Sequence, residues 1–142
     1  MMETGDNEDG WQRISANVQL AMEKLGPLSG IDFGLNRESV AWVEGFVERQ
    51  RERPDFDAAR IDGLVSVIGS FLGECVVVET GGRWQVGGDG NWGVLLPSGA
   101  TAYPFAKTRK QFLNGLAEGD SIASFYSVVV DHLATKTPGD SP

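Results

Sequence analysis

The feature that most constrains this chain is a helical repeat of apolar residues between positions 58 and 79. Apolar side chains recur there at i, i+3, i+4 and i+7, the spacing that places them on one face of an α-helix. The positions are Ile61, Leu64, Val65, Ile68, Phe71, Leu72, Cys75 and Val76. We therefore expect residues 58–79 to form a long central helix in the core.

Three glycines interrupt this segment, namely Gly63, Gly69 and Gly73. Each of them disfavours the helix by up to about 1 kcal/mol relative to alanine. Helices keep such residues where a neighbouring backbone comes close. We therefore expect another backbone to pack against this helix.

The apolar period changes from near four to two after Gly81-Gly82, and alternation of this kind is typical of half-buried strands. The alternating residues are Trp84 and Val86, then Trp92, Val94 and Leu96, then Thr101 and Tyr103. Turn-forming residues at 87–90 and 97–99 separate the three runs, which predicts a three-stranded antiparallel meander. A sheet this small needs cover on one face, and we expect the central helix to provide it.

Flanking helices are predicted on both sides of this unit. They span residues 11–25, 36–53, 104–114 and 120–133, with Pro27 ending the first, Asn36 capping the second and Pro104 opening the third. The inward residues are Trp11, Ile14, Val18, Met22 and Leu25 in the first helix, Phe105, Phe112, Leu113 and Leu116 in and after the third, and Ile122, Phe125, Val129 and Leu133 in the last.

The expected fold class is therefore α+β, with a long central helix packed on a three-stranded antiparallel meander and with flanking N- and C-terminal helices. One domain over residues 11–134 suits a length of 142 residues. Residues 1–10 and 135–142 offer little apolar surface to bury. Both segments are predicted to be disordered tails, the first of them acidic.

The charge balance restricts the kind of partner. Twenty acidic residues oppose twelve basic ones, a formal net charge of −8, which repels nucleic acid and anionic lipid and favours basic partners. The first ten residues lack the regions of a signal peptide, and no stretch has the roughly 20 consecutive apolar residues that cross a bilayer. Because a single cysteine rules out an internal disulfide, we expect a cytoplasmic protein without a membrane contact.

Several short motifs along the chain carry a family resemblance. They are Ile68-Gly69-Ser70-Phe71-Leu72-Gly73-Glu74, Gly81-Gly82-Arg83-Trp84, Trp92-Gly93-Val94, Pro104-Phe105, Asn114-Gly115 and the segment from Ser121 to Tyr126. Over residues 36–134 the chain resembles small uncharacterised bacterial domains in which an "LGE" helix leads into a "GG.W" strand and a "P(F/I)…K…K" helix. Some of these domains are encoded near toxin-immunity genes. The resemblance implies a fold and supplies no catalytic residue.

The residue inventory argues against the common catalytic centres. The chain has one histidine, His132, and one cysteine, Cys75, on separate predicted helices, so no metal site is expected. A Cys-His pair is not expected either, because Cys75 lies on the apolar face of the central helix, where burial raises the pKa of the thiol and keeps it unreactive. The glycines of 81–93 precede strands rather than a helix and are read as hairpin turns, not as a phosphate loop. Carboxylate pairs such as Asp55 with Asp57, or Glu74 with Glu79, remain open for acid–base chemistry. We expect no catalytic, cofactor-binding or metal-binding residue, no cofactor and no enzymatic activity.

Seven residues form the candidate structural or ligand site. They are Glu74, Arg83, Trp84, Trp92, Tyr103, Lys107 and Arg109. Glu74 lies one position off the apolar face of the central helix, and a half-buried carboxylate needs a donor or cation. We predict that it pairs with a basic residue, Arg83, Lys107 or Arg109. Lys107, Arg109 and Lys110 form a basic patch that either binds an anion beside Trp92 and Tyr103 or is an ordinary solvated helix face.

Two functions of different classes fit these observations. The first is a non-catalytic protein-binding module, an acidic immunity-type protein that neutralises a basic toxin. The alternative is a small-ligand binder or carboxylate-based hydrolase with a pocket lined by Trp84, Trp92 and Tyr103. Homodimerisation through a sheet edge or the first helix is a third, structural hypothesis.

Overall fold

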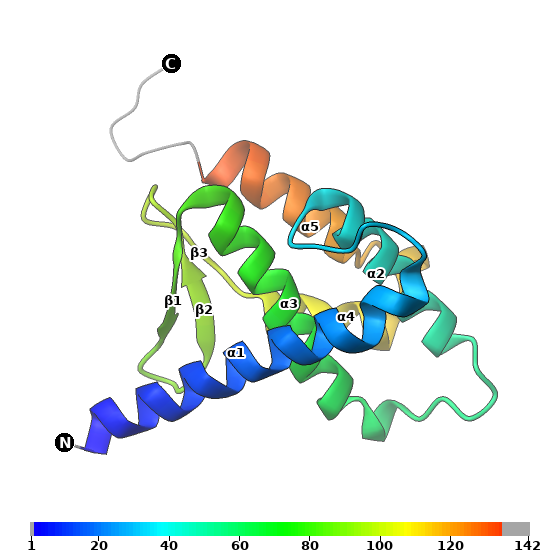
Figure 1. Ribbon diagram of the computed structural model, residues 1–142, viewed down its shortest axis with the longest axis horizontal. Helices are drawn as coiled ribbons and strands as arrows, with labels where there is room; N and C mark the ends of the chain where they lie inside the picture. The colour runs from blue at the N-terminus through cyan, green and yellow to red at the C-terminus, as the bar shows by residue number, and fades with distance from the viewer. Residues whose placement is uncertain (1, 135–142) are drawn as a thin grey trace.

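The computed structural model describes the backbone of residues 2–134 and the side chains from Glu8 onward. In chain order its elements are α1 (Met2–Ser29), α2 (Arg37–Arg51), a 3₁₀ turn (Ala58–Arg60), α3 (Asp62–Thr80), β1 (Arg83–Val86), β2 (Trp92–Leu95), β3 (Thr101–Ala102), α4 (Pro104–Asn114), a 3₁₀ turn (Leu116–Glu118), α5 (Ile122–Val128) and a π-helical extension (Val129–Leu133). The α+β prediction is confirmed. Figure 1 shows α3 in the middle of the molecule, with the sheet on one side and the other helices around it. The predicted tail over 135–142 lies outside the described residues.

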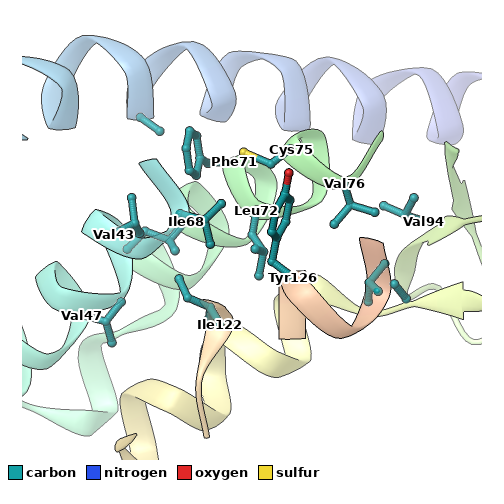
Figure 2. Close-up of a cluster of buried hydrophobic side chains, with 14 of the residues drawn as sticks. Val43, Val47, Ile68, Phe71, Leu72, Cys75, Val76, Val94, Ile122 and Tyr126 are labelled. Atoms are coloured by element: carbon teal, nitrogen blue, oxygen red, sulfur yellow. The ribbon is translucent and has the colours of Figure 1, made fainter. Parts of the chain in front are cut away.

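Helix α3 is the core of the fold, as its apolar repeat predicts. Ile68, Leu72, Cys75 and Val76 are completely buried, and Figure 2 shows them among side chains from α2, α5 and β2, beneath α1. Gly81 ends the helix in the left-handed region, with φ 77°. By length and composition α3 is apolar enough to cross a bilayer, but half of that stretch is buried inside the protein, as a core helix requires.

The backbones of α1 and α4 do pack against α3, but at two of its three glycines the nearest atoms belong to aromatic side chains. A Cβ on Gly69 would overlap the ring of Phe105, and one on Gly73 would overlap the ring of Trp84. Gly63 meets nothing within 4 Å. Flat rings need a site without a side chain just as a second backbone does, and the sequence does not distinguish the two.

The sheet has the predicted order and direction. Its strands run β1-β2-β3, both pairs antiparallel, with Trp84 opposite Val94 and Val94 opposite Ala102. Gly90 and Gly99 take positive φ values of 84° and 96° in the two turns. Val94 is completely buried and points toward Val76 of α3 in Figure 2.

Helix α1 differs from its prediction at both ends. It begins at Met2, where the sequence predicts a tail, and it continues through Pro27 to Ser29. Acidic residues in a first turn favour a helix because they face the positive end of its dipole. Pro27 lies in the last turn, and the helix continues for only two residues beyond it.

The buried face of α1 is also rotated relative to the prediction. Gly10, Ile14, Ala21 and Leu25 face inward, whereas the Trp11 side chain is 43% exposed and Val18 and Met22 are half-buried. A Cβ on Gly10 would lie 2.6 Å from the Trp92 ring, so this glycine allows the helix to rest on that ring. The prediction gave weight to large apolar residues, and here small residues make the contact.

The remaining helices begin where their capping residues predict. The Asn36 side chain accepts a hydrogen bond from the Ser39 N–H at 2.9 Å, and the Ser121 hydroxyl accepts one from the Ser124 N–H. Pro104 occupies the first turn of α4.

The inward faces of the last two helices contain errors in the prediction. Leu113 and Leu116 are 48% and 41% exposed, and the buried positions of α4 include Thr108 and Gln111. The Thr108 hydroxyl donates to the Pro104 carbonyl at 2.8 Å, so its burial leaves no unmet donor. In the last helix Tyr126 is buried in place of Phe125, and Leu133 is exposed.

Candidate functional site

Glu74 does not pair with a basic residue, so the predicted ion pair is wrong. The indole Nε1–H of Trp84 donates to Glu74 Oε1 at 3.0 Å. The cause is local: the Trp84 ring lies on Gly73, and this contact places its N–H beside the next residue of α3. The three proposed cations lie elsewhere, with Lys107 bonded to Asp120, Arg109 bonded to Asp62, and Arg83 exposed on β1.

The Glu74 side chain lines a groove between α1 and α3 with a volume of about 430 Å³. We call it the acidic groove. It is lined by Trp11, Ser15, Val18, Gln19, Met22, Glu23, Leu35 and Glu74. Its charged lining residues are both carboxylates, and among residues 8–134 no ion pair joins either of them to a cation. The groove therefore combines an apolar floor with negative charge that is not neutralised.

Three of the predicted site residues meet in a second hollow, which we call the aromatic cleft. It has a volume of about 490 Å³ and is lined by Val65, Ser66, Gly90, Asn91, Trp92, Tyr103, Phe105, Ala106 and Arg109. Trp92, Tyr103 and Arg109 were all named from the sequence. Trp84, the third aromatic residue of the predicted pocket, is not part of this lining. Its ring packs on Gly73 and is tilted against Phe105, with centroids 5.7 Å apart.

The predicted basic patch is divided between two surfaces. Arg109 lines the aromatic cleft, whereas Lys107 and Lys110 line a mostly apolar groove between α4 and the last helix. Lys107 Nζ lies 3.1 Å from Asp120 Oδ1. Hydrogen bonds from Asn114 and then from Lys107 hold the pKa of Asp120 below its usual range. The three cations therefore do not line a single hollow, although the two hollows share Tyr103 and Ala106.

Cys75 is the buried, inert thiol that the sequence predicts. Burial, and secondarily the charge of Glu74, raises the pKa of Cys75 far above its usual range. His132 is exposed on the π-helical extension. Within the described part of the chain, no three His, Cys, Asp or Glu side chains are grouped closely enough to hold a metal ion.

A buried polar cluster that sequence reasoning missed joins α2, α4 and α5. Gln111 Nε2 donates to the Glu44 carbonyl at 3.1 Å and to Glu48 Oε2 at 3.0 Å, while Gln111 Oε1 accepts from the Ile122 N–H. Glu44 Oε2 accepts from the Ala123 N–H at 3.1 Å and bonds the Ser121 hydroxyl. These acceptors satisfy the first N–H groups of α5. The cluster is therefore a structural joint, and its only sequence signal is a glutamine at a helix position where an apolar residue is expected.

Comparison with known proteins gave no match to a family model, to a curated protein or to a solved structure. The resemblance to bacterial domains encoded near toxin-immunity genes therefore stays a prediction, and the acidic groove and the aromatic cleft carry the functional argument.

Proposed function

We propose that this chain is a non-catalytic protein-binding module that uses the acidic groove to bind a basic partner protein, as an immunity-type protein would bind a basic toxin. The observation that carries this proposal is Glu74, a half-buried carboxylate whose hydrogen-bond donor is the neutral indole of Trp84. A carboxylate makes its strongest hydrogen bonds with cationic donors, and no cation within the described residues pairs with this one. Here the cation would come from the partner.

The apolar part of the groove supports the same function. The Trp11 side chain is 43% exposed at its edge, beside the half-buried Val18 and Met22. Exposed tryptophans often contribute much of the binding energy at protein interfaces. An indole face also attracts a guanidinium or ammonium group. A lysine or arginine with an aliphatic stem would therefore contact Trp11 along its length and Glu74 at its end.

The charge of the whole chain supports a basic partner as well. A net charge of −8 produces a field that attracts a cationic protein and speeds its association. In a complex of this kind the carboxylates would face a cationic surface. A toxin with a basic active site would be blocked by the same contact.

Quantitative capture with matched variants tests this proposal. The purified chain, its Glu74→Gln variant and its Trp11→Ala variant are immobilised and exposed to extract of the source cells, and captured proteins are identified and then titrated as pure components. The amide oxygen that Glu74→Gln introduces can still accept from Trp84, so this variant changes charge without removing the hydrogen bond. We expect a basic partner whose dissociation constant rises about tenfold or more in each variant, and whose binding weakens from about 0.05 M to about 0.5 M salt.

The matched control is Glu118→Gln, which removes an equal charge from an exposed position outside the groove. It should leave the dissociation constant within about a factor of two, because distant exposed charges are screened. If the partner proves acidic, or if all three variants bind equally well, the acidic groove is not the binding surface. If no saturable partner is found, the module proposal fails.

A further inference from the structure

The aromatic cleft is a second concave surface with a different chemistry. Its walls are three rings, from Trp92, Tyr103 and Phe105, and its charged lining residue is the cation Arg109. The acidic groove, in contrast, is lined by two carboxylates. A ligand suited to one surface is therefore unsuited to the other.

The rings provide an apolar wall that is accessible yet fixed in place. The Tyr103 side chain is 52% exposed. Trp92 is half-buried, and one part of its ring lies against Gly10 of α1, which limits the positions that the indole can take. Flat ligands and sugar rings stack on aromatic walls of this kind.

Arg109 adds a cation that is only weakly engaged within the protein. In the described part of the chain it makes one hydrogen bond, from Nη2 to Asp62 Oδ1 at 2.8 Å. The two side chains are 45% and 82% exposed, and exposed ion pairs contribute little to stability. A guanidinium has five N–H donors arranged to bind a carboxylate through two parallel bonds. A ligand carboxylate can therefore replace or join Asp62.

The polar residues at the edge complete the recognition set. Ser66 is exposed and offers a hydroxyl. The Asn91 backbone N–H donates to Asp89 Oδ1 and the Asn91 side-chain amide donates to Asp89 Oδ2, each at 3.0 Å, so Asn91 is held in place. A volume of about 490 Å³ is within the range of small-molecule sites. We propose that the aromatic cleft binds a small ligand that combines a flat ring with a carboxylate.

Titration with two matched probes tests this site. Indole-3-acetate has a flat ring and a carboxylate, and indole-3-ethanol has the same ring without the charge. Isothermal titration and chemical-shift mapping on the full chain should show saturable binding of indole-3-acetate. We expect indole-3-ethanol to bind at least about tenfold more weakly than indole-3-acetate, because the charge-assisted bonds to Arg109 are lost. The shifts should centre on the Trp92 and Tyr103 rings.

Arg109→Met and Tyr103→Ala separate the two halves of the site. Both side chains are substantially exposed, so neither change should unfold the chain. Arg109→Met should reduce indole-3-acetate affinity about tenfold and abolish the preference for the acid over the alcohol. Tyr103→Ala should weaken both probes. Lys110→Met is the matched control, since it removes an adjacent cation of α4 that lines a different groove.

Two further measurements make the result decisive. Glucuronate, a carboxylate on a ring that is not flat, should bind about tenfold more weakly than indole-3-acetate, and equal or tighter binding would show that the cleft does not require a flat ring. Glu74→Gln should leave both affinities unchanged, so failure of the cleft and failure of the proposed protein-binding function are separable. Absence of saturable binding for all three probes, or equal losses in Arg109→Met and Lys110→Met, would overturn the proposal.

Discussion

Two joints of this fold are built by different means. Helix α3 meets the sheet and α4 through shape, because Gly69 and Gly73 leave space for the rings of Phe105 and Trp84. Helices α2, α4 and α5 meet through hydrogen bonds centred on Gln111, which is completely buried. Added side-chain volume at the first joint should lower the free energy of unfolding, whereas loss of a polar group there should matter little. At the second joint, loss of a polar group should have the larger effect.

The largest effect is expected at the polar joint, in Gln111→Ala. The change leaves the buried Ile122 N–H without its acceptor and Glu48 Oε2 without the Gln111 donor, and it opens a small cavity. We expect a loss of about 3 kcal/mol in the free energy of unfolding, measured by urea denaturation. Gln12→Ala, on the exposed face of α1, is the control and should change stability by no more than about 0.5 kcal/mol. Equal effects in the two variants would contradict a structural role for the cluster.

The next largest effect is expected at the shape joint, in Gly73→Ala. A methyl group there would overlap the Trp84 ring and lie 3.0 Å from Pro104 Cγ, both packed against α3. We expect a loss of about 2 kcal/mol, even though alanine favours a helix. Gly63→Ala, in the same helix but facing open space, should instead gain about 0.5 kcal/mol. If both variants are stabilised, the ring contact is not close.

A smaller effect is expected where the polar joint starts helix α5. Ser121→Ala removes the cap of the Ser124 N–H and the bond to Glu44. Loss of a helix cap of this kind costs about 1 kcal/mol. Ser124→Ala keeps the backbone N–H and the cap, so it should leave the denaturation midpoint nearly unchanged. A midpoint shift in Ser124→Ala as large as that in Ser121→Ala would show that capping is not the cause.

The smallest effect is a pH dependence at Asp120, which joins α4 to the loop before α5. Its pKa is lowered in the folded chain, first by the Asn114 hydrogen bond and then by Lys107. The carboxylate therefore stabilises the fold above its unfolded pKa of about 3.9, and this contribution is lost as the pH falls through the lower folded pKa. The stability difference between wild type and Asp120→Asn should shrink from pH 7 to about pH 2.5. A difference that is constant with pH would argue against the lowered pKa.

The contrast between the joints also explains what the sequence could predict. The apolar repeat of α3, the alternation of the strands and the cap at Asn36 act through neighbours in the sequence, and the sequence predicts all three correctly. The contact of Gly10 with Trp92 joins residues far apart in the chain and involves a residue without a side chain. The spacing of apolar residues carries no information about such a contact, so the sequence does not predict where α1 starts or which face of it is buried.

The candidate site shows the same division. Trp92, Tyr103 and Arg109 were named from residue type and do lie together, because the short β3 leads directly into α4. The partner of Glu74 was predicted from charge alone. Its actual partner follows from where Gly73 allows the Trp84 ring to rest, a constraint of shape that the sequence carries only as an unexplained glycine.

The position of the Trp92 ring limits how far the aromatic cleft can open. The same indole forms part of the cleft wall and lies directly against the main chain of α1, with no side chain between them at Gly10. A compound that tilts this ring must displace the opening turns of α1, or else be resisted by them. The stiffness of the long first helix therefore sets how wide the hollow can open.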